Sequence, residues 1–556
     1  ITSLSTSTSG TSNFIAGVNA GNSITSGGNY NVVVGDEAGT AITTGDSNSL
    51  VGSTSGDAIT TGVNNTLIGS RAGTAITTSS YNVGVGEAAL YTNILGSKSV
   101  AIGQSALYNQ NPASAIDVYN VAVGSNAGAA VTTGVQNTLI GGLAGDATTT
   151  GSYNVALGKD SLTANTTGGS NVALGKSSMA ANTTGGNNTA VGTLAVLSNT
   201  TGSNNVAVGR EALEANTTAS NNTAVGYQSL TANTTGHSNT ASGVNTLLLN
   251  TTGTQNTALG MGALVFNTTA SNNTAVGFNS LNANTTGTQN TALGALALDA
   301  NTTANDNVAI GYGALTANTT GSENTAVGGY NTLGANTTGA NNVAVGRLAL
   351  TANTTGADNT AVGKSAGTVT TTGSGNTCLG HGINTASAVS NYNLVAGYNS
   401  SAASAGNGWA TFGYNNTRTY ISLGNTSWSG TSDSRLKENV ADHTLGLGFI
   451  NALRPVTYNW KKKKDVPSEL SDYYKEGSND RVNGTDGLRH GFIAQEVKTV
   501  MDSNSLASDS FNLWNTMGDG TQALADGELI PVLTKAIQEL STQLDAALAR
   551  ITTLEG

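Results

Sequence analysis

Several residue types are scarce in this 556-residue chain, and each scarcity excludes a class of protein. Only 10% of the residues are charged and 5% are aromatic, and both values are low for a globular protein. Four prolines beside 73 glycines exclude collagen, which needs abundant proline and glycine at every third place. A single cysteine, Cys378, leaves no disulfide framework. Long apolar runs are also missing, so we expect no membrane insertion.

The charged and metal-binding residues narrow the choice of partners further. A net charge of −11 argues against nucleic acid, because phosphate binding needs a basic face. The four histidines stand far apart in no ligand spacing, so we expect no metal and no cofactor. Of the 21 Lys and Arg residues, 13 lie after residue 431, which indicates a domain boundary there. The chain starts at Ile1 rather than Met, so we expect an anchor or leader upstream of it.

A repeat fills residues 1–397. Its unit, Asn-x-Ala-(Val/Leu/Ile)-Gly, recurs every 17 residues almost throughout, from Gly17 to a weak last copy at Gly413. One longer unit, between Gly103 and Gly124, carries Pro112, and we interpret its extra residues as a loop insertion. Two short apolar runs per unit, separated by Gly and Asn-Thr-Thr-Gly, predict two strands per coil. The shaft is therefore predicted to be a long parallel β-solenoid of about 24 coils.

Asparagine and alanine dominate the rest of the unit. One asparagine series falls in register and predicts a side-chain ladder from coil to coil: Asn165, Asn182, Asn199, Asn216, Asn233 and Asn250. Asn-Thr-Thr also matches the N-glycosylation acceptor, but we interpret these residues as turn and ladder residues. Because a single thin coil buries little apolar surface, we predict that the alanine face packs against neighbouring chains. The unit resembles the repeats of trimeric autotransporter adhesin heads, and this resemblance implies a homotrimeric β-roll.

Aromatic residues gather where the repeat fails, in residues 398–431. Two interpretations remain open for this stretch. It can be a plug that closes the open end of the solenoid, which repeat proteins need. It can also be a tip that binds a receptor glycan, where aromatic faces stack on sugar rings. The candidate contacts are Trp409, Tyr414, Tyr420 and Trp428.

Residues 432–556 have the composition of an ordinary small domain. A short helical pattern turns into a strand over residues 449–460, and a second strand runs into a helix over residues 490–497. The chain ends in an apolar 3–4 spacing over residues 530–554, which predicts a coiled-coil seam. The seam residues are Ile530, Leu533, Ile537, Leu540, Leu544, Ala547, Ile551 and Leu554. A small α+β domain with a terminal coiled coil is therefore predicted.

Four motifs in this segment resemble those of one family. They read Ser432-Asp-x-Arg-Leu-Lys437-x-Asn, then Leu-Arg-Pro-Val-x-Tyr-x-Trp, then Gly-Phe-Ile-Ala-Gln-Glu-Val, then Leu-Ile-Pro-Val-Leu-x-Lys-Ala-Ile-Gln-Glu-Leu. Their order and spacing resemble the intramolecular chaperone domain of endosialidases and related phage tail fibres. The resemblance implies that this segment trimerises the fibre during folding. In many members of that family the domain then cuts itself off with a Ser-Lys dyad.

The resemblance assigns the parts of such a dyad. Ser432 would be the nucleophile and Lys437 the general base, with the cut at Ser432–Asp433 and with Asp433 and Arg435 as positioning residues. A serine hydroxyl needs a base, and a lysine desolvated in a trimer interface can lose its proton near neutral pH. The alternative is a chaperone that folds the fibre and never cleaves.

Three functions follow from these features. We predict a structural fibre of a viral tail, extracellular on the virion, that attaches to a host cell-surface receptor with a glycan as one candidate. A bacterial surface adhesin with the same shaft is the alternative. A polysaccharide depolymerase is less favoured, because glycosidases need two facing carboxylates and the acidic residues of the shaft are scattered.

Overall fold

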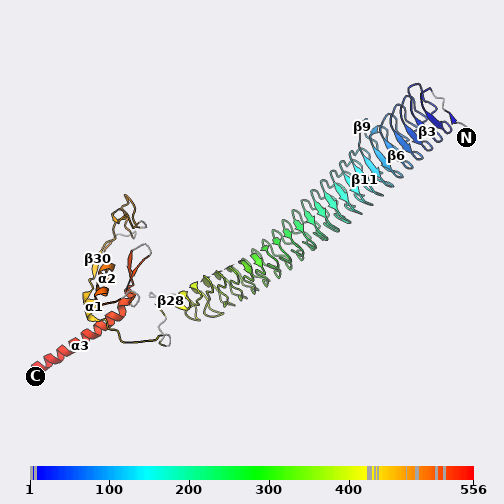
Figure 1. Cartoon of the computed structure of the whole chain (residues 1–556). Helices are drawn as coiled ribbons and strands as arrows, with labels where there is room; N and C mark the ends of the chain where they lie inside the picture. The colour runs from blue at the N-terminus through cyan, green and yellow to red at the C-terminus, as the bar shows by residue number, and fades with distance from the viewer. Residues whose placement is uncertain are drawn as a thin grey trace. The chain divides into compact units, whose positions relative to one another are not determined.

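A computed structural model of the chain describes residues 4–5, 9–422, 429–430, 434, 437–470, 473–482, 487–506, 511–517 and 521–556. The chain divides into two compact units, residues 1–431 and 432–556, and each is described by itself. The first is a rod of stacked coils, and the second is a small domain that ends in a long helix (Figure 1). The predicted fold class, a mostly β chain with a solenoid of about 24 coils and a small helix-ended domain, is confirmed.

The rod is built on one 27-stranded sheet in which each described coil gives one parallel strand to the next. Partners lie one repeat apart, as Ala207 with Ala224 and Val208 with Val225. These strands are β2 (Phe14–Ala16), β3 (Val32–Val34), β4 (Ser49–Val51), β5 (Thr66–Ile68), β6 (Val83–Val85), β8 (Val100–Ile102), β10 (Val121–Val123), β11 (Thr138–Ile140), β12 (Val155–Leu157), β13 (Val172–Leu174), β14 (Thr189–Val191), β15 (Val206–Val208), β16 (Thr223–Val225), β17 (Thr240–Ser242), β18 (Thr257–Leu259), β19 (Thr274–Val276), β20 (Thr291–Leu293), β21 (Val308–Tyr312), β22 (Thr325–Tyr330), β23 (Val343–Val345), β24 (Thr360–Val362), β25 (Thr377–Leu379), β26 (Leu394–Tyr398) and β27 (Trp409–Tyr414).

The glycine that follows each strand fixes the close approach of the coils. Gly226, after β16, has φ +133°, a region that residues with a Cβ rarely adopt. A Cβ at this position would lie 2.3 Å from the carbonyl oxygen of Gly243 in the next coil. The glycine spacing in the sequence therefore marks the pitch of the solenoid as well as its corners.

The prediction of two strands per coil is wrong for residues 9–422, where each coil holds one strand of the long sheet. The second apolar run, Ser229 and Leu230 in the coil that starts at Asn222, belongs to a turn. Gln228 and Leu230 both have φ +54°, which is left-handed and outside the β region. The Leu230 N–H still donates to the Thr246 carbonyl of the next coil at 3.0 Å, so the backbone is paired without forming a strand.

The central residue of each short strand, which is alanine in most coils and a larger apolar residue such as Leu50 in others, faces the interior of its own coil. Ala224 and Leu230 are both fully buried within the single chain, and this pair of rows continues along the rod. The prediction that the alanine face packs against neighbouring chains is therefore wrong. Because strand side chains alternate, the residues on either side of the alanine point outward instead, and Val225 is 38% exposed.

Two asparagine ladders run along the rod: the predicted one spans Asn165 to Asn353, and a second one spans most of the coils. The predicted ladder is confirmed, since the Asn233 amide donates to the Asn216 side-chain oxygen at 3.0 Å and to the Gly236 carbonyl at 2.9 Å. The second ladder comes from the first residue of the unit: Asn222 accepts the Asn239 backbone N–H at 2.9 Å and donates to the same Gly236 carbonyl at 2.9 Å. The asparagines of the twelve Asn-Thr-Thr sites are buried, which confirms them as ladder residues.

A glutamine bridges the coil in which serine replaces the asparagine of the second ladder. Serine stands at position 99 of the second ladder, and its short side chain cannot span to the next coil. The Gln110 amide fills the gap, donating to the Ser99 hydroxyl at 2.9 Å and accepting from Asn120 at 2.9 Å. The added residues form β9 (Ile116–Asp117), which pairs in parallel with β7 (Gly96–Ser97).

The second unit has three helices and two antiparallel strand pairs among its described residues. Its core gathers Phe449, Val497, Met501, Leu513 and Val532 from elements far apart in sequence. The elements are α1 (Leu447–Ala452), β30 (Val456–Tyr458), η2 (Lys463–Asp465), β31 (Arg489–Gly491), α2 (Ala494–Ser503), β32 (Trp514–Thr516), β33 (Gln522–Leu524), η3 (Asp526–Glu528) and α3 (Leu529–Glu555). The two predicted changes between helix and strand are both confirmed, at α1–β30 and at β31–α2.

Removing one rung of the predicted ladder should destabilise the rod. Asn233→Ala deletes two donated hydrogen bonds and leaves the Asn250 amide without its 2.8 Å acceptor, all in a buried setting. Unsatisfied buried polar groups cost about 1–3 kcal/mol each, so we expect a loss of about 3 kcal/mol in guanidinium unfolding. Thr235→Ala, an exposed change in the same turn, should stay within about 0.5 kcal/mol of wild type. Equal stability of the two variants would refute the ladder's role.

Candidate functional site

An antiparallel hairpin closes the last coil of the rod. β28 (Thr417–Ser422) pairs antiparallel with β27, and β29 (Ser429–Gly430) pairs antiparallel with β28. At the other end, β1 (Leu4–Ser5) pairs antiparallel with β2. A reversed strand covers the hydrogen-bonding edge that a further coil would otherwise extend. Among the described residues of 398–431, this pairing fits the plug interpretation, which stays a prediction.

The predicted tip residues fall into two separate aromatic groups. Trp409 and Tyr420 pack edge to face on neighbouring strands, with ring centroids 5.6 Å apart. Tyr414 lies in a tilted pair with Tyr398 at 5.8 Å. Trp428 lies outside the described residues. The two groups differ because Trp409 and Tyr414 are five residues apart on one strand, so their side chains leave opposite faces of it.

One ring of the second group was missed from the sequence. His381 stacks on Tyr398, with ring centroids 5.1 Å apart, and so extends the row of rings to three coils. The signal was available, since His381 precedes Tyr398 by one repeat and Tyr414 follows it by nearly one. The exposed Tyr398 and Tyr414 give this end of the shaft an aromatic surface.

The predicted cleavage junction lies largely outside the described residues. Ser432, Asp433 and Arg435 are not among them, so no distance joins the serine to the lysine. Lys437 is described, its side chain is exposed, and its backbone N–H donates to the Ser434 carbonyl at 3.2 Å. The dyad therefore stays a prediction that rests on the sequence motif.

The C-terminal helix α3 has one face in its own domain and one face outside it. Leu529, Val532 and Ala536 are buried against the domain core. The Glu539 carboxylate accepts the Leu447 N–H at the start of α1, at 2.8 Å, and ties the two helices together. The seam residues predicted from the heptads are instead exposed, from 42% for Leu533 to 85% for Leu554.

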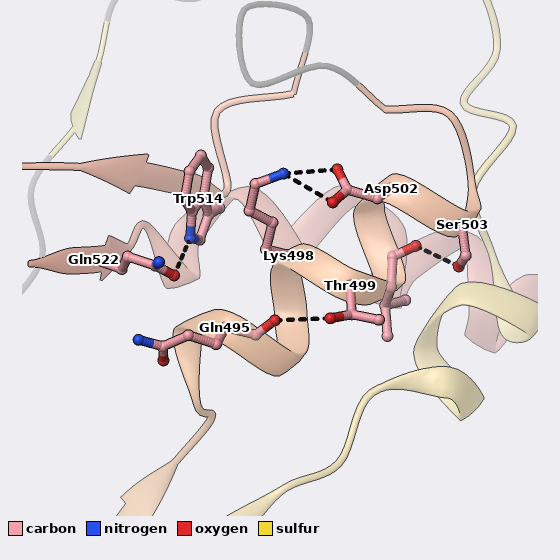
Figure 2. Close-up of polar contacts among 8 residues, drawn as sticks. Gln495, Lys498, Thr499, Asp502, Ser503, Trp514 and Gln522 are labelled. Atoms are coloured by element: carbon pink, nitrogen blue, oxygen red, sulfur yellow. Dashed lines mark hydrogen bonds and ion pairs between the residues drawn. The ribbon is translucent and has the colours of Figure 1, made fainter.

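A polar cluster fixes the β32–β33 hairpin on α2 (Figure 2). The Lys498 ammonium lies 2.8 Å from both carboxylate oxygens of Asp502 and 4.8 Å from the centre of the Trp514 ring. The Trp514 indole N–H donates to the Gln522 side chain at 2.9 Å. The cation–π contact between Lys498 and Trp514 is thus oriented by Asp502 on one side and by Gln522 on the other. The cluster joins the β32–β33 hairpin to α2. Its charged and polar groups bond to one another.

Two of the scattered acidic residues of the shaft, Glu87 and Glu211, form ion pairs or hydrogen bonds with neighbouring side chains. Glu87 pairs with Arg71 at 2.6 Å, and Glu211 pairs with Arg210 and accepts from the Gln228 amide at 2.8 Å. Within the described ranges, no three His, Cys, Asp or Glu side chains are grouped so that they could hold a metal ion. The described helices also include none with the length and apolar character to cross a membrane.

Residues 432–506 match the protein family described as chaperone of endosialidase. No curated protein and no solved structure matches the chain. The chain therefore combines a β-solenoid shaft with a second unit that is similar, over residues 432–506, to endosialidase-type chaperone domains. This combination fits a fibre-like or spike-like protein.

The single thiol should be inert in the folded shaft. Cys378 lies in β25 with 1% of its surface exposed, and burial raises the pKa of its thiol to about 12. The reactive thiolate is therefore negligible at pH 8, and the side chain is also out of reach of reagents. We expect no reaction of native protein with a disulfide-exchange reagent at pH 8, and one thiol per chain after denaturation. Thr235→Cys, at an exposed position, should add one fast-reacting thiol, and fast labelling of native wild type would contradict the buried strand.

Proposed function

We propose that the chain is the structural fibre of a viral tail, which reaches the host surface and is assembled as a homotrimer by its C-terminal domain. The observation that carries this proposal is the family match on the unit that follows the shaft. A long rod of identical coils supplies length and stiffness, and its end bears exposed rings at Tyr398 and Tyr414 that suit contact with a receptor glycan. Such a fibre acts outside the cell.

Self-association is supported by the outer seam of α3. Leu540, Leu544 and Ile551 are each at least half exposed on a helix of 27 residues. Apolar residues at a and d spacing bury themselves in the holes of facing helices, so copies of this helix form a parallel coiled coil. A three-stranded coil would bring three shafts into register at their ends.

The outer face of the shaft sheet supports the same association. Two columns flank the buried alanines, and the valines, leucines and isoleucines in them are roughly 40% exposed in coil after coil, as at Val206 and Val208. A standard interface buries about 800 Å² per partner, and this face repeats over most coils of a rod with 24 parallel strands, so it is long enough to supply such an area. We infer that this face, rather than the alanine row, is what neighbouring copies cover.

Self-cleavage would release the chaperone once the fibre has assembled. Attack of Ser432 on its own carbonyl would close a strained four-membered ring, so the Ser432 hydroxyl of a neighbouring copy would attack the carbonyl carbon of the Ser432–Asp433 peptide while a Lys437 amine removes its proton. The leaving amine takes a proton as the C–N bond breaks, and water then hydrolyses the ester to regenerate the serine. Lys437 is exposed in the single chain, so we propose that cleavage follows assembly rather than precedes it.

The bacterial surface adhesin is the second candidate. The shaft repeat resembles that of adhesin heads, and the same rod would serve either protein. A segment upstream of Ile1 that anchors the chain in a cell envelope, rather than in a virion, would decide for the adhesin.

Charges placed in the α3 seam should block assembly. Leu540→Glu with Leu544→Glu puts like charges at facing positions of the coil, so we expect insoluble or monomeric chains in light scattering. Gln538→Glu with Thr542→Glu adds the same charges to the other side of the helix and should leave trimers that resist SDS without boiling. If the variant with Leu540→Glu and Leu544→Glu still formed trimers of unchanged stability, α3 would have no role in assembly.

Substituting the dyad should keep the protein whole. We expect wild type to yield a fragment that begins at Asp433, and Ser432→Ala and Lys437→Ala each to remain at full length by intact mass and N-terminal sequencing. Lys437→Arg should behave like Lys437→Ala, because guanidinium keeps its proton and cannot act as a base. Cleavage that persists in Ser432→Ala would refute the dyad, and uncleaved wild-type trimers would make the domain a permanent cap.

A further inference from the structure

One column of outward side chains runs along a corner of the shaft, formed by the residue just before each asparagine of the second ladder. These residues adopt a left-handed backbone, as at Asn187 with φ +58° and Asn204 with φ +58°. Asn, Ser, Gln and other polar residues fill most of the column. Asparagine suits it best, because its short polar side chain tolerates this conformation.

Five tyrosines break the pattern of this corner column. Tyr81, Tyr119 and Tyr153 lie close together in the N-terminal half, whereas Tyr30 and Tyr392 stand alone. Each is at least half exposed, so the ring buries little surface within the chain. A bulky residue at φ +62°, as at Tyr81 and Tyr153, also strains the backbone. Burial within the coil therefore gives no reason for a ring at these places.

The three clustered tyrosines lie on every second coil. The strands that follow them are β6, β10 and β12, and β8 and β11 lie between these in the sheet (Figure 1). Two strand spacings amount to about 9.6 Å, so the rings form an evenly spaced row. The coils between them carry Lys98 and Gln136 in the same column, both with hydrogen-bonding side chains.

The insertion holds the middle ring in place. Asp117, from the added strand β9, lies 2.7 Å from the Lys98 ammonium and 3.3 Å from the Tyr119 hydroxyl. Lys98 also donates to that hydroxyl at 3.1 Å and lies 5.2 Å from the centre of the Tyr119 ring. The charge of Lys98 is thus balanced locally, and the site as a whole is close to neutral.

We propose that Tyr81, Tyr119 and Tyr153 form a stacking row for an extended, neutral, β-linked polysaccharide on the side of the shaft. In such a chain every second sugar turns the same face to one side, at a repeat similar to two coils. The rings would then stack on alternate sugars, while the hydroxyls of the sugars between them meet Lys98 and Gln136. This row is separate from the aromatic end of the shaft and does not depend on cleavage or on the tip.

The test measures retention of the full-length chain on insoluble cellulose, chitin and β-1,4-xylan, with starch as the α-linked comparison. We expect wild type to bind at least one β-linked matrix and not starch. Tyr81→Asn with Tyr119→Asn and Tyr153→Asn should weaken that binding at least about tenfold, because the stacking surface is removed. Asparagine is the residue that neighbouring coils already use here, so the fold should be kept, as circular dichroism and SDS resistance would show.

The matched control is Tyr30→Asn with Tyr392→Asn, which removes rings from the same column away from the row. It should bind within about twofold of wild type, since single distant rings cannot share one sugar chain with the others. Four results would each overturn the proposal: no β-linked matrix retains wild type, starch retains it equally well, the triple variant binds as wild type does, or the control loses binding to the same extent. Loss of trimers in the triple variant would also overturn it, by assigning the row to an interface between copies.

Discussion

Register between coils is the constraint on which the rest of the shaft depends. Each ladder asparagine is buried and bonded to the coils beside it, and Gly236 shows how one carbonyl serves both ladders at once. Buried polar groups must find partners, so the amides allow only the pairing in which asparagine meets asparagine. A slip of one residue would bring the outward valines inside and turn the alanines out. The ladders therefore fix the pitch, and the pitch places every other side chain.

Because the buried rows keep one register along the rod, the charged and aromatic residues of the shaft vary mainly in the outward columns. The sheet face is apolar through most of the rod, the corner column is mainly polar, and the position after the strand glycine changes along the chain. At that position, Tyr312 stacks on Tyr330, and Arg347 lies over the Tyr330 ring. A rod of this kind can carry different surfaces side by side, since a change at an exposed place leaves the ladder bonds intact.

The C-terminal unit has a helix that is covered on one face only. Its helix α3 buries Leu529, Val532 and Ala536 in its own domain and leaves the seam from Ile530 to Leu554 without cover in the single chain. The domain can thus fold around one face of the helix while the other face recruits copies. A shaft whose coils are nearly identical needs such an external guide, because its sheet faces would pair equally well in several registers.

The period, the number of coils, one of the ladders and the resemblance to endosialidase-type chaperone domains could all be predicted from the sequence, because glycine spacing and ordered motifs are local signals. The turn at Leu230 could not be predicted, because the burial of this side chain, which offsets the cost of its left-handed backbone, depends on the next coil. The inward direction of alanine and the opposite faces of Trp409 and Tyr414 also follow from the folded coils. Alternation along a strand gives two faces, but the sequence does not say which one the rest of the coil will cover. In the sequence, the spacings between Tyr81, Tyr119 and Tyr153 are unequal. They become equal in the fold because the longer coil, like the others, adds a single strand to the sheet.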